Sequence, residues 1–299
     1  MKEIVEILKT VSSFANGEQA ILATVLDVKG SGYRLPGARM LMLANGQTVG
    51  TVSGGCLEAD VLERAKKVFA SGEAEVFTYD TTGDEDSVFS LNMGCRGVID
   101  IRLEPIGKFS PVIDKIRVAY EDRIGNDEFE VPIAIKLFGA GADAVPFVRI
   151  ASELGWQLTV HDHRPAFLTA ERFPAAQMLI HQPADDALTD LETDDRTAVV
   201  IMTHNYARDR YILPQTLNSD AFYIGALGPK RRTEQLLEEI GGAFTPEQLA
   251  RLYAPAGLDI GADTPEGIAL SIIGEIQTVL ANRNAGHLRN RQGSIYDRK

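Results

Sequence analysis

The sequence feature that most constrains the fold is a glycine turn between an apolar run and an amphipathic stretch. The run Ile133–Phe138 is typical of a buried parallel strand, and residues 145–154 are typical of a helix with one apolar face. In the turn, Gly139 permits a tight bend, Gly141 has no Cβ to keep a pyrophosphate away, and Ala144 allows close packing of helix on strand. This G-x-G-x-x-A turn therefore predicts a Rossmann-like βαβ unit.

An acidic residue completes the pattern. The next predicted strand, 157–161, is followed by Asp162, about 20 residues after Gly139. A carboxylate at this place accepts hydrogen bonds from the ribose of a dinucleotide. Asp162 favours NAD as the ligand because a carboxylate repels a 2′-phosphate, whereas the nearby Arg164 would also allow NADP to bind. NAD(P) or another nucleotide is therefore a candidate ligand, and a βαβ unit without a bound dinucleotide is the alternative.

Length and composition indicate a globular chain of about two domains and disfavour several classes of protein. The 299 residues are 44% hydrophobic and 24% charged, and their net charge of −12 argues against a general nucleic-acid binder. The start of the chain lacks a secretory pattern, and no apolar run is long enough for a membrane span, so a cytoplasmic protein without membrane contact is expected. The two cysteines, Cys56 and Cys95, are then expected as reduced thiols.

Hydrophobic periodicity divides the chain into an N-terminal α+β domain, 1–108, a linker with a short helix, 109–130, and a C-terminal α/β domain, 131–299. In the C-terminal domain strands alternate with helices, which predicts a doubly wound parallel sheet. Thr264 is expected to cap the last helix, with Pro265 at its first position. Helices are predicted at 2–15, 57–70, 145–154, 230–240 and 264–282, and strands at 20–28, 40–43, 48–52, 75–79, 98–103, 133–138, 157–161, 176–180, 198–202 and 222–224, with a hairpin turn at Asn45-Gly46.

Cys56 is the strongest candidate for a functional residue in the N-terminal domain. It follows Ser53-Gly54-Gly55 at a predicted helix start, where free backbone N–H groups stabilise an anion such as a thiolate. The glycines let a ligand reach the backbone, and a thiolate there can hold a soft metal or pass on sulfur. Against this, Glu58 and Asp60 lie in the same first turn, and free cysteines are commonly small buried residues. Both interpretations remain open.

Cys95 and His204 carry weaker signals. Cys95 lies in a second glycine-flanked loop beside Arg96, which can favour a thiolate or pair with phosphate, and a packed loop residue is the alternative. The two cysteines have no histidines nearby and do not form a zinc pattern. His204 follows a predicted strand, at the sheet edge where α/β folds bind ligands, and is a candidate acid or base. A helix cap at Asn205 is the alternative there.

Two blocks of the sequence resemble the XdhC/CoxI family of molybdoenzyme maturation factors. The first block comprises 30–37 and 50–58, with the string Ser53-Gly54-Gly55-Cys56-Leu57-Glu58. The second comprises the glycine turn, 203–205, 225–228 and 254–266, with the string G-L-D-I-G-A at 257–262. These two strings are specific, whereas the G-x-G turn is not.

The resemblance implies a cytoplasmic factor that binds molybdenum cofactor (molybdopterin), aids addition of its terminal sulfido ligand and inserts it into a xanthine dehydrogenase-type molybdenum hydroxylase. It implies that apoenzyme and a cysteine desulfurase as partners, and a homodimer. Cys56 would handle the cofactor and its molybdenum, and Cys95 matches a second family cysteine, although Arg96 replaces a family glycine. Two other functions remain open, an NAD(P)-dependent oxidoreductase that uses the C-terminal domain and a thiol-based sulfur carrier or redox protein.

Overall fold

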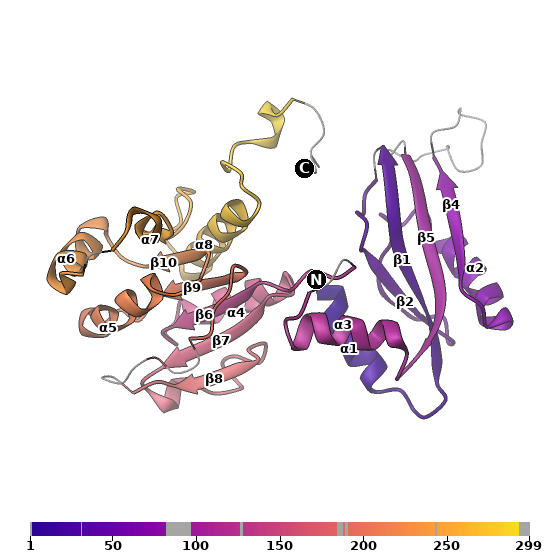
Figure 1. Cartoon of the computed structure of the whole chain (residues 1–299), viewed down its shortest axis with the longest axis horizontal. Coiled ribbons are helices and arrows are strands. Elements are labelled where there is room, and N and C mark those ends of the chain that lie inside the picture. The colour runs from indigo at the N-terminus through magenta and orange to yellow at the C-terminus, as the bar shows by residue number, and fades with distance from the viewer. Residues whose placement is uncertain are drawn as a thin grey trace. The chain divides into compact units, whose positions relative to one another are not determined.

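The computed structural model describes residues 2–30, 32–81, 97–125, 128–183, 188, 191–242 and 244–292. Contacts within the chain divide it into two compact units, Met1–Pro132 and Ile133–Lys299 (Figure 1). Each unit has its own sheet and its own hydrophobic cores. None of the helices in the described part of the chain has the length and apolar character that crossing a bilayer requires.

The described residues of the first unit form an antiparallel sheet of five strands in the order β3-β2-β1-β5-β4. The strands are β1 (Gln19–Gly30), β2 (Arg39–Leu43), β3 (Thr48–Gly50), β4 (Glu75–Asp80) and β5 (Gly97–Gly107). The long strands β1 and β5 pair through the centre of the sheet. β2 pairs antiparallel with β3, and Gly46 between them has a φ of 84°, so the predicted hairpin is confirmed.

Helices cover both faces of this sheet because successive residues of β1 point to opposite sides. Ala20 and Leu22 belong to the core shared with α1 (Lys2–Ser12) and α3 (Pro111–Glu121). Ile21 and Ala23 belong to the core that contains the inner face of α2 (Glu58–Ser71). Figure 1 shows α1 and α3 side by side, apart from α2.

The segment 109–130, predicted as a linker with a short helix, lies within the first unit. Its helix α3 buries Ile113, Ile116 and Ala119 in the core shared with α1. Phe129 belongs to the same core, and the guanidinium of Arg39 lies 4.3 Å from the centroid of its ring. The described part of this segment is therefore packed structure.

The described residues of the second unit form a sheet of six strands in the order β11-β10-β9-β6-β7-β8. The strands are β6 (Ala134–Phe138), β7 (Gln157–Asp162), β8 (Met178–His181), β9 (Thr197–Ile201), β10 (Tyr223–Ala226) and β11 (Leu252–Tyr253). All the pairings in this part of the chain are parallel. Counted along the chain from β6, the order is 3-2-1-4-5-6, which is that of the Rossmann fold. The predicted doubly wound parallel sheet is confirmed.

Helices cover both faces of the second sheet. α4 (Ala144–Glu153) and α8 (Pro265–Leu280) share a core with Ile135 and Leu137 of β6, whereas α5 (Tyr206–Leu217) and α6 (Lys230–Ile240) share one with Phe138. Thr264 caps α8 by accepting the N–H of Gly267 at 3.1 Å, as predicted. Shorter elements are α7 (Pro246–Ala250) and the 3₁₀ helices Pro165–Phe167 and Leu288–Asn290. α5, α7 and β11 were not predicted from the sequence.

Candidate functional site

Cys56 lies in the loop that joins β3 to α2, and its thiol is exposed. α2 begins at Glu58, so the cysteine precedes the helix by two residues. The residues Ser53, Gly54 and Gly55 belong to the same loop. An exposed sulfur can be reached by a ligand, which a cysteine packed in an apolar core cannot.

Ser53 holds this loop together. Its hydroxyl accepts the N–H groups of Gly55 and Leu57, each at 3.1 Å, and donates to the carboxylate of Glu58. Glu58 also accepts the N–H of Ser53 at 2.8 Å, so one carboxylate takes both the backbone and the side-chain donor of Ser53. The N–H groups of Gly55 and Leu57, which precede α2, are therefore bonded to Ser53. The Cys56 thiol donates to the same hydroxyl, with Sγ 3.6 Å from Oγ.

The two glycines before Cys56 serve different purposes. Gly55 has a φ of 106°, which side-chain-bearing residues rarely adopt. Gly54 lies so close to the ring of Tyr33 that a Cβ on residue 54 would come within 3.2 Å of a ring atom. Tyr33, in the loop between β1 and β2, is 62% exposed, so a flat aromatic surface lies against the loop that carries Cys56.

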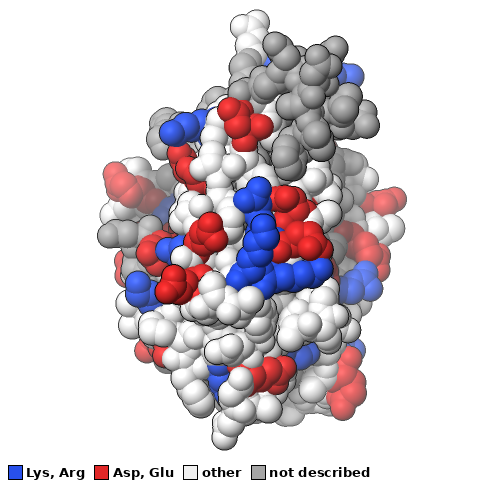
Figure 2. All heavy atoms as spheres, turned by 90° about the vertical axis from the view of Figure 1, so that its right-hand side faces the viewer, with Lys and Arg blue, Asp and Glu red and all other residues white. Residues whose placement is uncertain are grey.

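The acidic residues beside Cys56 are paired within the first unit. Glu58 is held by Ser53, and Asp60 accepts hydrogen bonds from Arg64 and from the Tyr79 hydroxyl. Although burial opposes the shift, these bonds lower the pKa of Asp60. On the face of the molecule in Figure 2, basic side chains likewise gather in a small group bordered by acidic ones.

Cys95 and Arg96 lie outside the described residues, in the segment 82–96. Within the ranges that the structure describes, no group of three or more His, Cys, Asp or Glu side chains is placed to hold a metal ion. Among these residues, Cys56 is thus a candidate ligand only for a metal whose other ligands belong to a bound cofactor.

In the second unit, the glycine turn follows β6 at the point where the strand order reverses. Gly139 has a φ of 115°, and a Cβ there would overlap the carbonyl oxygen of Met202 at the end of β9. The packing of the chain itself therefore requires Gly139. In contrast, a Cβ on Gly141 would meet only His204, at 3.8 Å. The packing of the chain thus does not require a glycine at position 141, and the space beside Gly141 is open to a ligand.

Asp162 ends β7 as predicted, but its carboxylate is fully engaged by the protein. The side chain accepts the N–H of Ala140 at 2.6 Å, and from Arg164 it accepts the backbone N–H at 2.8 Å, Nε–H at 2.9 Å and Nη2–H at 2.8 Å. Asp162 is only 3% exposed. Although burial opposes ionisation, the Arg164 side chain and the two backbone N–H groups lower the pKa of Asp162 to about 2.

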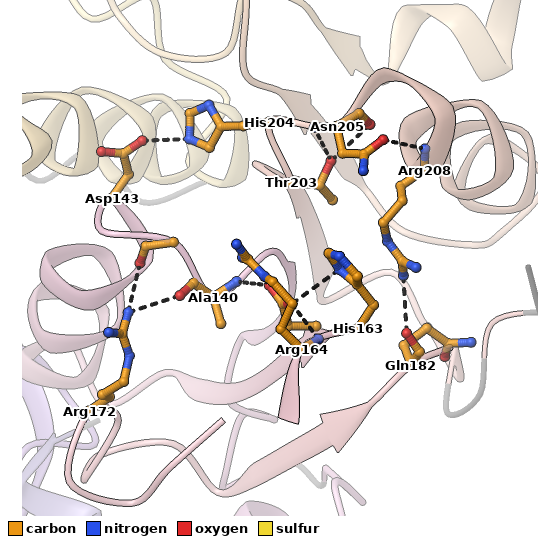
Figure 3. A network of polar contacts seen from close by, with 12 residues as sticks. Ala140, Asp143, His163, Arg164, Arg172, Gln182, Thr203, His204, Asn205 and Arg208 are labelled. Carbon is orange, nitrogen blue, oxygen red and sulfur yellow. Dashed lines mark hydrogen bonds and ion pairs between the residues drawn. The ribbon is translucent and has the colours of Figure 1, made fainter. Parts of the chain in front are cut away.

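Two arginines lie beside this turn. The guanidinium carbon of Arg164 is 4.0 Å, and that of Arg172 is 5.0 Å, from the centroid of the Phe167 ring. Arg172 Nη2 donates to the carbonyl oxygens of Ala140 and Gly141 at 3.0 and 3.4 Å (Figure 3). Arg172 was not a predicted site residue, because nothing in the local sequence ties it to the turn.

His204 lies across the turn from α4. Its φ of 53° is unusual for a residue with a side chain, and Nε2 lies 2.8 Å from a carboxylate oxygen of Asp143, the residue before α4 (Figure 3). The ring is 59% exposed, so a ligand can reach it. Asn205 accepts the N–H of Arg208 at 3.2 Å and caps α5, which is the alternative given for this position.

A buried carboxylate fixes the loop that carries His204. Asp209 of α5 accepts a hydrogen bond from Thr203 Oγ1 and one from Arg232 Nη1 at 2.8 Å. Burial raises the pKa of Asp209, against the effects of Thr203 and Arg232. Sequence reasoning missed Asp143 and Asp209, although Asp143 stands directly before a predicted helix, where Asp is common.

The G-L-D-I-G-A string, residues 257–262, is anchored to α8. Glu275 accepts the N–H of Gly257 at 2.8 Å and the hydroxyl of Tyr223 at 2.6 Å. Ser271 Oγ donates to the carbonyl oxygen of Leu258 at 2.6 Å. This specific part of the sequence therefore has a fixed backbone beside β10 and α8.

The predicted site residues thus form two groups, each within one unit. Ser53, Gly54, Gly55 and Cys56 share one loop of the first unit, and Gly139, Gly141, Asp162 and His204 lie at the carboxyl ends of β6, β7 and β9 in the second.

Comparison with known proteins gives matches for both units. Residues 13–80 match the model of the XdhC and CoxI family, and residues 135–276 match that of the XdhC Rossmann domain. A probable xanthine dehydrogenase subunit from Bacillus subtilis is 29% identical over 87% of this chain and 92% of its own length. The molybdenum cofactor insertion chaperone PaoD of Escherichia coli is 25% identical over 90% of this chain and 86% of its own. A crystal structure described as a xanthine dehydrogenase from Bacillus halodurans is similar with a TM-score of 0.78 and 28% identity, over 95% of this chain and 97% of that one.

Proposed function

Because this chain belongs to the XdhC/CoxI family, we propose that it is a chaperone that binds molybdenum cofactor and inserts it into a molybdenum hydroxylase of the xanthine dehydrogenase type. The names of two relatives, a cofactor insertion chaperone and a probable xanthine dehydrogenase subunit, support this proposal. The chain would then be a binding and transfer protein and not an enzyme that turns over a substrate.

The observation that carries the proposal is the exposed thiol of Cys56 in a loop fixed by Ser53. Bound molybdenum cofactor supplies a soft metal centre that its own dithiolene already holds. One protein thiolate suits such a centre, and soft sulfur ligands are those that a soft metal prefers. The described residues fit this requirement, since they offer Cys56 but no cluster of three or more candidate ligands. Gly54 and Gly55 leave the backbone of the loop open to the cofactor.

The exposed ring of Tyr33 fits the organic part of the cofactor. It lies against Gly54, in the loop of Cys56, and its flat face can stack on a pterin ring. In this arrangement Cys56 binds the metal end and Tyr33 orients the heterocycle.

We further propose that the chain holds the cofactor while its terminal sulfido ligand is added, with a cysteine desulfurase as the sulfur source. The partners would be this desulfurase and the apo molybdenum hydroxylase, and the chain would act as a homodimer in the cytoplasm. These points follow from the family resemblance. The exposed position of Cys56 supports them because both partners need access to the cofactor.

The test is the cofactor content of the full chain purified from a molybdenum-replete host. Molybdenum and pterin per chain are measured for the parent, for Cys56→Ser and for Cys95→Ser. Serine keeps the size and a hydrogen-bonding group but removes the soft ligand, so Cys56→Ser should retain the cofactor at least about tenfold more weakly. Activation of a cofactor-free xanthine dehydrogenase-type enzyme should fall in parallel.

The outcomes separate the parts of the proposal. Equal cofactor content in the parent and in Cys56→Ser would remove Cys56 as a ligand. A parent chain that neither retains nor delivers the cofactor would refute the proposed function. Circular dichroism of both serine variants shows whether the fold is intact.

A further inference from the structure

The glycine turn of the second unit fits a dinucleotide, but the acid beside it does not act as it does in NAD-binding folds. In those folds the carboxylate that ends the second strand accepts ribose hydroxyls. Here both oxygens of Asp162 already accept N–H groups, from Ala140 and from Arg164. The residue is also nearly completely buried. To bind a ribose hydroxyl, Asp162 would have to give up a charge-assisted hydrogen bond to Arg164 or the bond that fixes the turn.

The surface that remains at this strand end is cationic. The Arg164 side chain is 38% exposed, and within the described residues its Nη1 has no hydrogen-bond partner. Its Nε and Nη2 bonds to Asp162 and the Phe167 ring beneath it hold the guanidinium in place. A fixed guanidinium with a free N–H edge is suited to a phosphate.

Arg172 adds a second positive charge beside the same turn. Its described partners are two carbonyl oxygens and two aromatic rings, and no carboxylate of the described chain pairs with it. Its Nε is buried and has no hydrogen-bond partner in that part of the chain. Because Phe167 contacts both guanidinium groups, the two arginines are held at the same end of β7.

Two of the nearby carboxylates already have arginine partners. Asp162 is paired with Arg164 and Asp209 with Arg232, whereas Asp143 contacts His204, which carries a charge only when it is protonated. Arg172, whose described polar partners are carbonyl oxygens, therefore lies next to a turn whose Gly141 leaves open space. An anionic group of a bound ligand would balance the charge of Arg172.

We infer that this crevice binds adenine nucleotides that carry a 2′-phosphate, the NADP(H) class, in preference to nucleotides with a free 2′-hydroxyl. Arg164 and Arg172 select the phosphate, and Gly141 leaves room for the pyrophosphate. An arginine near the end of the second strand is the usual means by which a Rossmann fold accommodates a 2′-phosphate. The inference concerns binding by the second unit alone and does not depend on the role proposed for Cys56.

The direct test uses the unmodified full chain and three small probes. Isothermal titration compares 2′,5′-ADP, 3′,5′-ADP and 5′-AMP, which differ only in the presence and place of one phosphate. We expect 2′,5′-ADP to bind at least about tenfold more tightly than 5′-AMP, and NADPH to exceed NADH by a similar factor. Equal binding of 2′,5′-ADP and 5′-AMP would overturn the inference. Tighter binding of 3′,5′-ADP would also overturn it, because that phosphate position is the one found in coenzyme A.

A variant pair locates the selectivity. Arg172→Met keeps much of the apolar stem but removes the charge, and Arg149→Met makes the same change at an exposed position of α4. Arg172→Met should reduce the preference for 2′,5′-ADP over 5′-AMP at least about fivefold, while 5′-AMP still binds. Arg149→Met should leave the affinities for both nucleotides unchanged. A full preference in Arg172→Met would contradict the assignment. Fluorescence of Trp156, which is buried in the second unit, checks that each variant is folded.

Discussion

Replacing Asp162 by asparagine tests whether this carboxylate is a structural anion of the glycine turn. The side chain accepts four hydrogen bonds, three of them from Arg164 and one from the N–H of Ala140. Asparagine keeps the shape and one acceptor oxygen, but it removes the charge and turns the second oxygen into a donor. We expect Asp162→Asn to destabilise the second unit at neutral pH.

The magnitude follows from the pKa. The pKa of Asp162 falls from 3.8 to about 2 in the folded chain, and roughly 1.4 kcal/mol corresponds to one pKa unit. Because the folded pKa is depressed, ionisation stabilises the fold above about pH 4, and this stabilisation is lost as the pH falls toward 2. The contribution is about 2 kcal/mol at pH 7 and about half of that at pH 3. The difference in unfolding free energy between parent and variant should shrink accordingly.

The assay is denaturant unfolding followed by tryptophan fluorescence at pH values from 7 to 3. The sequence has one tryptophan, Trp156, and it is buried in the core beneath α4 and α8, so its emission reports on the second unit. A parent–variant difference that stays constant over this range would refute the reasoning, because it would assign the loss to shape and not to charge. An Asp162→Asn variant as stable as the parent would refute it outright.

Two further predictions concern the same unit. Gly139→Ala should destabilise the second unit by about 1–3 kcal/mol, because residue 139 has a positive φ and its Cβ would overlap the carbonyl oxygen of Met202. Gly141→Ala should change the stability by less than about 0.5 kcal/mol. Equal effects of the two substitutions in the Trp156 assay would contradict this contrast. Glu275→Ala should leave the Gly257 N–H and the Tyr223 hydroxyl without their acceptor, which should lower the free energy of unfolding by about 1–3 kcal/mol. Hydrogen exchange of the backbone amides in 257–262 should then accelerate. Unchanged exchange there would show that the Glu275 carboxylate does not anchor the string.

Periodicity predicted most of the fold, and α5 shows where it fails. This helix contains Pro214 and buries Arg208 and Asp209, so its sequence has no clear apolar face. The buried charges are stable because Arg208 donates to the carbonyl of Gln182 and Asp209 pairs with Arg232. Such partners come from elsewhere in the chain, and no local pattern contains them. In contrast, α6 has a regular apolar spacing, and its bounds agree with the prediction.

The same limit applies to the candidate sites. The glycines and Asp162 could be placed at the sheet edge from spacing alone, but that Asp162 is saturated depends on the rotamer of Arg164 and on the orientation of the Ala140 N–H. Similarly, the sequence indicates a helix start after Cys56, but not that the Ser53 hydroxyl takes the N–H groups there. Competition among hydrogen-bond partners is decided by three-dimensional geometry, so it lies beyond the reach of sequence patterns.

The order of strands in the first sheet has a consequence for how the protein is made. β1 is the central strand, and its pairing with β5 joins Gln19 to Gly107. Contacts between such distant residues form slowly, so on the ribosome the edge of β1 that faces β5 must wait until nearly the whole first unit has been synthesised, although β2 can pair with the other edge earlier. Through that interval one edge of an apolar strand is unpaired in the nascent chain. A protein of this topology is itself expected to depend on general folding assistance during its translation.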